Sequence, residues 1–251
     1  MSEQKVKIDI SNIQNFFDLI LCERNASREE VYNFLQDCLK FVFAINKIDI
    51  SKYEIQFHTI KISDDDVFGA KMSQDMKKPN KFDVFFSQDD IVLKCLTKES
   101  IEQLFTLMFM ALHEFGHIIQ FIKYQDVMDA YDKEHEIVFK NMCDFVKYQD
   151  RKSQNLITRQ YLKHEEAKLL ISSIERDASY QAYQYSKIIF NTLLTYEDDK
   201  IMQAFLQSGI KFSNKMRQDL YKKYRIADKE NNEALRILNS FGIKKEDLLT
   251  Y

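Results

Sequence analysis

The sequence has very few residues that break regular secondary structure. Proline occurs once and glycine 4 times in 251 residues. This scarcity excludes collagen-like and linker-rich chains and favours a strongly helical protein. Hydrophobic residues make up 45% and charged residues 30%, a composition typical of a globular protein rather than a disordered one. The length fits one domain, or one domain with a helical extension.

Paired cysteines and long apolar runs are also missing. The four cysteines are scattered and form no CxxC pair: Cys22, Cys38, Cys95 and Cys143. Such cysteines favour free thiols in a reducing compartment. The N-terminal segment carries charges throughout, unlike a signal peptide, and the apolar stretch 104–112 is shorter than the ~20 residues of a membrane span. We therefore predict a soluble, cytoplasmic protein with no membrane partner.

No charge of one sign dominates the chain. The formal net charge is −3, which argues against a nucleic-acid-binding domain. The lysine pairs at 77–78, 222–223 and 244–245 lie far apart, so we interpret them as solvated faces. We expect no nucleic-acid partner, and the sequence predicts no particular oligomeric state.

The first hundred residues change from helical to strand periodicity. Ser11 is expected to cap a helix that ends near Cys22, and a capping box at Ser27 and Glu30 begins a second helix that ends near Asn46. Alternation of apolar and polar residues then predicts a strand at 53–59, and further candidate strands follow at 67–72, after the Pro79 turn at 82–86, and at 91–96.

From Thr97 onward the pattern is almost wholly helical. Thr97 is expected to cap a helix that runs to about Tyr124. Further helices are predicted at 128–150, 158–192, 198–208, 213–226 and 229–240. The order of elements is therefore helices, a small sheet and a helical block, which is an α+β, mostly helical fold.

One motif carries chemistry: residues 113–117 read HEFGH, an HExxH pattern. His113 and His117 lie one turn apart on the same helical face, so both imidazoles reach one metal ion. Glu114 flanks that face without belonging to it, which is the position of a general base. With only 5 histidines in the chain, chance rarely gives this pattern.

The helix around the motif is apolar on nearly every side and is expected to be buried. Its polar residues gather on one stripe, which also contains Gly116: Thr106, His113, His117 and Gln120. Buried polar groups need partners. We therefore favour a metal site over a merely structural pair of histidines.

Two histidines need a third protein ligand, and Glu175 is the strongest candidate. It shares a helical face with a stripe of small residues, which lets another helix approach closely: Ser172, Ala178, Ser179, Ala182 and Ser186. Gly116 offers the matching gap on the first helix. The competing candidates for the third ligand are His164, Glu165 and Glu166. The plainer interpretation is that Glu175 binds no metal and lies on a solvated helix face.

These two motifs together resemble the ImmA/IrrE type of zinc metallopeptidase, over residues 53–190. The matching residues are His113, Glu114, Gly116 and His117, then Glu175, Asp177, Ala178, Ser179 and Ala182. The resemblance implies a zincin-like fold with a small sheet ahead of the zinc helix. The chain departs from the family in its long spacer, with a helix inserted around 128–150, and in showing no helix-turn-helix.

A second departure concerns a bracing residue. Other gluzincins, which the second motif also resembles, use an aspartate four residues after the ligand glutamate to brace a histidine. Ser179 occupies that place here, and Asp177 and Gln120 are the alternative braces.

We therefore predict that residues 1–195 form a zincin-like metallopeptidase domain and residues 196–251 a C-terminal helical extension on the same body. One zinc ion per chain is bound by His113, His117 and Glu175. Glu114 activates a zinc-held water to hydrolyse a peptide bond, in a protein or peptide substrate within the cell. The strand at 82–86 is expected to be an edge that pairs with an extended peptide.

Alternatives remain at this stage. The protein could be a regulatory or binding module on a zincin scaffold with little turnover, and the C-terminal helices could bind a partner or dimerise. Tyr180, Tyr183 and Tyr185 are candidates to stabilise an oxyanion, although core packing is the commoner role. His58 and His135 are interpreted as structural.

Overall fold

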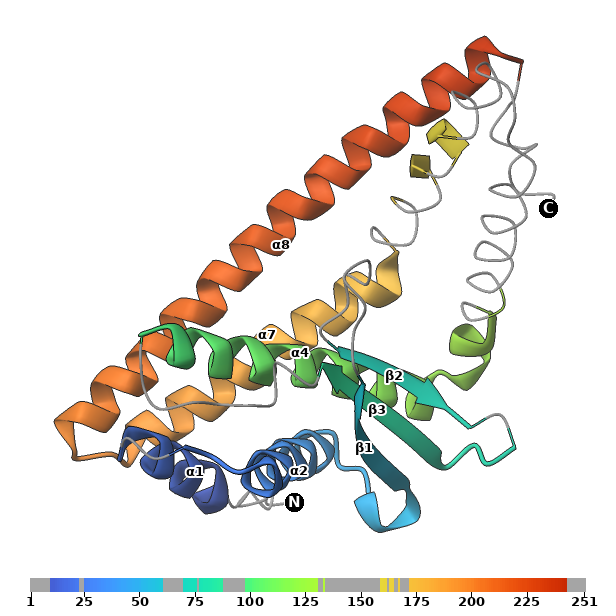
Figure 1. The fold of residues 1–251 in the computed structure, drawn as a ribbon. Helices are drawn as coiled ribbons and strands as arrows, with labels where there is room; N and C mark the ends of the chain where they lie inside the picture. The colour runs from blue at the N-terminus through green and yellow to red at the C-terminus, as the bar shows by residue number, and fades with distance from the viewer. Residues whose placement is uncertain are drawn as a thin grey trace, which may run out of the picture. The chain divides into compact units, whose positions relative to one another are not determined.

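A computed structural model describes the chain over residues 10–22, 25–60, 70–75, 77–87, 98–130, 133, 159–161, 163, 164, 167 and 172–242. Within these residues the protein is mostly helical with one small mixed sheet, which confirms the predicted α+β class (Figure 1). The zincin-like identity of the fold stays a prediction.

Two N-terminal helices begin as the sequence indicates, with one difference. α2 spans Arg28–Ile45, and its capping box is formed: the Glu30 N–H donates to Ser27 Oγ, and the Ser27 N–H donates to the Glu30 carboxylate. α1 spans Ser11–Leu21, but its N-cap is Ile10 and no side chain caps it. Ser11 is thus the first helical residue, and the predicted Ser11 cap was wrong.

The sheet has the strand order β1-β3-β2. The short 3₁₀ helix η1 (Ile50–Lys52) leads into β1 (Glu54–Ile60), and β2 (Ala70–Gln74) and β3 (Lys81–Ser87) follow. β3 pairs with β1 in parallel and with β2 antiparallel. β3 is therefore the central strand, so the prediction that it is an edge was wrong.

One face of this sheet packs on the core. Phe82, Val84 and Phe86 of β3 are fully buried, as their alternation predicts. The Phe57 ring of β1 stacks on the Phe115 ring, with centroids 5.9 Å apart, and Phe115 belongs to α4 (Lys98–Lys123). The sheet thus rests on the helix that carries the HExxH motif.

Among the described residues, α4 is the one helix that is both long and apolar enough to resemble a membrane span. The window Ile101–Lys123 is long and apolar enough to cross a membrane by composition, but 78% of it is buried inside the protein. Such burial is typical of the core helix of a soluble protein. The cytoplasmic compartment stays a prediction.

The C-terminal helices differ from the prediction. α7 spans Ser173–Thr195, and α8 is one continuous helix, Lys200–Ser240, where the sequence predicts three. Gly209 lies in the gap between the predicted helices 198–208 and 213–226. It does not end a helix there; it makes room for a neighbouring side chain. A Cβ there would lie 2.5 Å from the Phe190 ring, so the glycine lets that buried ring pack against α8.

Several predicted elements fall outside the described residues. They are the strand at 91–96, the Thr97 cap, most of the helices at 128–150 and 158–172, and the start of the strand at 67–72.

The contacts of the chain group into two compact units. Met1–Ile119 and Ala178–Arg217 form the first, which contains the sheet, and Gln120–Asp177 and Gln218–Tyr251 form the second. α4, α7 and α8 each continue from one unit into the other. The division that the sequence predicts near residue 195 stays a prediction.

Gly209→Ala is expected to lower the free energy of unfolding by up to about 2 kcal/mol. Alanine usually stabilises a helix interior by ~1 kcal/mol over glycine, but crowding the Phe190 ring, which is itself packed against Phe17 and Phe105, costs about 1–3 kcal/mol. Chemical denaturation measures the difference. Exposed Ser208→Ala is the control and should change stability little; a stabilised Gly209→Ala would contradict this packing role.

Candidate metal centre

His113 and His117 face one another across one turn of α4. Their Nε2 atoms lie 3.1 Å apart, and the two rings are perpendicular, at 89°. When two nitrogens bind the same tetrahedral zinc ion, each at 2.0–2.1 Å from the metal, the two nitrogens are about 3.3 Å apart. The two imidazoles therefore already have the separation that a shared metal ion requires.

Glu175 of α7 joins this pair. One potential ligand atom from each of His113, His117 and Glu175 lies within 4.8 Å of the others. The structure thus contains a possible metal-binding group made of the three residues that the sequence predicts as ligands. Its donor set is two imidazole nitrogens and one carboxylate oxygen.

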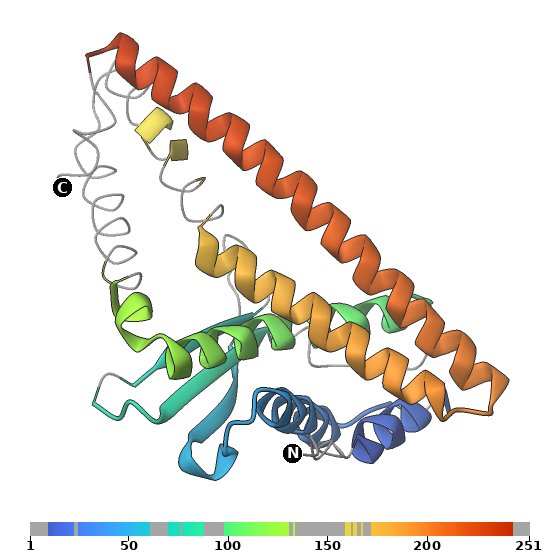
Figure 2. The same cartoon turned by 180° about the vertical axis from the view of Figure 1, so that it is seen from behind.

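A close approach of the two helices makes this grouping possible. α7 crosses α4 in both views of the chain (Figures 1 and 2). A Cβ at Gly116 would lie only 3.3 Å from the Ala178 Cα and 3.4 Å from its carbonyl oxygen. Gly116 and Ala178, two of the small residues that the sequence singles out, therefore lie at the contact. Glu175 precedes Ala178 by one turn of the same helix.

Ser179 contacts the other nitrogen of His113. Its Oγ lies 3.2 Å from His113 Nδ1. When Nδ1 carries the proton and donates it to Ser179, the Nε2 lone pair is left to face His117 and a metal. Ser179, which is buried, is therefore placed to brace His113. The alternative braces, Gln120 and Asp177, instead hydrogen-bond to each other at 2.8 Å.

Of the competing ligands, His164 is described by the structure, and it does not join the group. His164 is buried, and its Nδ1 lies within hydrogen-bond distance of Asn231 Oδ1 on α8. No sequence signal pointed to Asn231, because a contact 67 residues away follows no local pattern. Glu165 and Glu166 lie outside the described residues.

Burial differs around the group. Glu114 and His117 are buried, at 9% and 8% exposed, whereas His113 and Glu175 are half-buried. Glu114 adjoins His113 in the chain, so the metal face and the glutamate are neighbours on one turn of α4. The arrangement provides three potential ligands, two of them half-buried, and a buried glutamate next to His113 in the chain.

The candidate tyrosines have other partners or are exposed. Tyr183 Oη donates to Asn214 Oδ1 at 3.2 Å, and Tyr185 Oη donates to Gln181 Oε1 at 3.0 Å. Burial alone raises the pKa of the Tyr183 phenol, but hydrogen bonds from Arg217 and Lys187 lower that pKa below its usual value. Tyr180 is 49% exposed. None of these contacts favours an oxyanion-stabilising role.

The other histidines were interpreted as structural. His58 Nε2 lies 2.7 Å from Asp83 Oδ1 on the neighbouring strand, and its ring stacks on Phe85. This cross-strand pair agrees with a structural role in the sheet. His135 lies outside the described residues.

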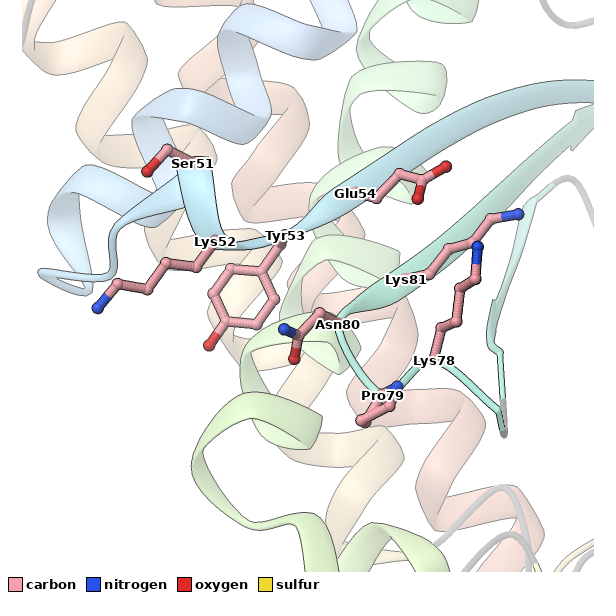
Figure 3. Close-up of a pocket in the computed structure, with 8 residues that line it drawn as sticks. All are labelled: Ser51, Lys52, Tyr53, Glu54, Lys78, Pro79, Asn80 and Lys81. Atoms are coloured by element: carbon pink, nitrogen blue, oxygen red, sulfur yellow. The ribbon is translucent and has the colours of Figure 1, made fainter.

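A surface pocket lies at the start of β1 and β3, and it contains none of the metal-group residues. Its lining residues are Ser51, Lys52, Tyr53, Glu54, Lys78, Pro79, Asn80 and Lys81. Figure 3 shows Lys52 pointing to the side opposite Lys78 and Lys81. Because its cations do not converge, we assign this pocket no function.

No family model matches this chain, and no curated protein or solved structure matches it either. The resemblance to ImmA/IrrE-type peptidases therefore rests on the two motifs and stays a prediction. The site's chemistry has to be argued from its own residues.

His113→Ala and His117→Ala are each expected to abolish stoichiometric metal binding, because each removes one of three ligands. Elemental analysis of dialysed protein measures the bound metal. His164→Ala is the matched control: it removes a buried histidine that lies against Asn231, and metal content should not change. A metal content that depends on His164 but not on His113 would show that the ligands are misassigned.

Ser179→Ala is expected to weaken metal binding about 10–100-fold, the usual effect of losing a partner that orients a metal-binding histidine. The titration should compete the protein against a chromophoric chelator. Ser186→Ala, which removes a buried serine hydroxyl from the same helix, should leave the affinity unchanged. Equal affinities for Ser179→Ala and the unmodified protein would exclude the brace.

Proposed function

We propose that this protein is a zinc-dependent metallopeptidase that hydrolyses a peptide bond in a specific protein of the same cell. The observation that carries the proposal is the grouping of His113, His117 and Glu175, with buried Glu114 beside them. A merely structural histidine pair needs neither the converging carboxylate nor the adjacent glutamate.

The residues present fit zinc. Two histidines and one glutamate, with a fourth position left open, are a donor set of catalytic zinc sites. The 3.1 Å separation of the Nε2 atoms suits tetrahedral coordination. Because two histidines and one carboxylate also suit ferrous iron, elemental analysis has to name the metal.

Bound zinc would polarise the substrate carbonyl and lower the pKa of a water molecule. The chain's own residues supply the rest of the chemistry. Glu114 would accept the proton of the attacking water and return it to the leaving amine, which makes it both base and acid. Its burial places this carboxylate where little solvent competes for the proton.

The half-buried side of the group supports access of a substrate. His113 and Glu175 keep more contact with solvent than His117 and Glu114 do. A peptide would therefore approach from the side of His113 and Glu175. The resemblance to ImmA/IrrE-type peptidases agrees with this chemistry and adds the expectation of a zincin-like fold.

Glu114→Gln is expected to keep the zinc and the fold but to lower the rate of hydrolysis at least 10²–10⁴-fold, the usual effect of removing a general base. Glutamine has nearly the same size but cannot accept a proton at neutral pH. Glu102→Gln, an exposed position on the same helix, is the matched control and should keep full activity.

The assay needs the true substrate, and the inactive Glu114→Gln protein can serve to trap candidates from the cell. Cleavage of the trapped protein by the unmodified enzyme then measures the rate. If Glu114→Gln cleaves it as fast as the unmodified enzyme does, Glu114 is not the base. A zinc-binding protein that holds its partner without cutting it would favour the regulatory or binding module.

A further inference from the structure

Gln120 is a buried polar residue of α4 that the hydrolytic chemistry does not use. It lies three residues after His117, on the same stripe of the helix, and is 4% exposed. Its Nε2 donates to the Ile174 carbonyl oxygen at 3.0 Å and to Asp177 Oδ2 at 2.8 Å. One side chain thus uses both of its N–H donors on α7.

The two acceptors flank Glu175. Ile174 precedes it and Asp177 follows it by two residues, and α7 begins at Ser173. All three residues therefore belong to the beginning of the helix, where few intrahelical bonds hold the backbone. Gln120 fixes this turn to α4, the helix that carries the two histidines.

The same turn has a second, weaker attachment. Arg176 donates to Asp228 at 3.1 and 3.3 Å and lies over the Tyr224 ring of α8. The Arg176 and Asp228 side chains are 42% and 48% exposed, so solvent screens this pair. The bonds of the buried Gln120 amide are better shielded, and leaving them unmade costs more.

We infer that Gln120 is a positioning residue for the third metal ligand: its amide holds the first turn of α7 so that the Glu175 carboxylate faces the two imidazoles. The inference rests on the proposed metal site and adds to it. Groups that orient a metal ligand commonly contribute 10–100-fold to metal affinity. Gln120 would orient Glu175 indirectly, through its hydrogen bonds to the Ile174 carbonyl and to the Asp177 side chain.

The test is a double-mutant cycle on zinc affinity, measured on the full chain by competition with a chromophoric chelator. Gln120→Met keeps the length of the side chain and removes its donors. We expect it to weaken zinc binding about 10–100-fold when Glu175 is present. In a Glu175→Gln background the same change should alter affinity less than about threefold, since no ligand is left to position.

Two further variants keep the result interpretable. Asp177→Ala removes one acceptor at an exposed position, where folding is not at risk, and should weaken zinc binding in the same Glu175-dependent way. Gln125→Met is the matched control, because the Gln125 amide donates to Asp129 near the end of the same helical region. Its zinc affinity should equal that of the unmodified protein.

The outcomes separate the inference from the proposed function. An equal loss of affinity in both Glu175 backgrounds would show a general structural role for Gln120 and overturn the inference. Unchanged affinity in Gln120→Met and Asp177→Ala would overturn it too, while leaving the metal site intact. An unmodified protein that binds no zinc would overturn both the site and the inference. Thermal unfolding of the metal-free variants shows whether each one is folded.

Discussion

The close approach of α4 and α7 is the contact on which the candidate site depends. At Gly116 there is no space for a side chain, because a Cβ would lie 3.3 Å from the Ala178 backbone. This proximity lets short polar side chains bridge the helices: Ser179 reaches His113, and Gln120 reaches Asp177. A side chain at Gly116 would force the neighbouring Ala178 backbone to shift by a few tenths of an ångström, which would change the geometry of these hydrogen bonds.

Two members of the polar stripe of α4, His113 and Gln120, have hydrogen-bond partners on α7. Imidazoles and amides lose free energy when buried without hydrogen bonds. His113 and Gln120 are seven residues apart, two turns of α4, and their partners Ser179 and Asp177 lie near one another on α7. One of these hydrogen bonds is made by His113, a member of the metal-binding group, and the other by Asp177, two residues after Glu175.

The sequence predicted what is local and missed what is not. The HExxH helix, the capping box of α2 and the strands at 54–60 and 81–87 follow from spacing within one element. The small-residue stripe also predicted the contact at Gly116. Strand order depends on pairing between distant segments, so the central place of β3 was missed. The break predicted between residues 208 and 213 was wrong, because Gly209 packs against Phe190 of another helix within one continuous α8.

A serine hydroxyl in place of a carboxylate as the partner of His113 would change how much each proposed ligand contributes to metal affinity. A carboxylate partner would raise the basicity of His113 and bring negative charge near the ion, whereas the Ser179 hydroxyl is neutral. Glu175 is then the only anionic ligand in the donor set. Metal affinity should therefore depend more on the placement of that carboxylate than in a site with a charged brace. If the buried Gln120 amide holds the Glu175 turn as inferred, this dependence is the physical reason why that amide would contribute to metal binding.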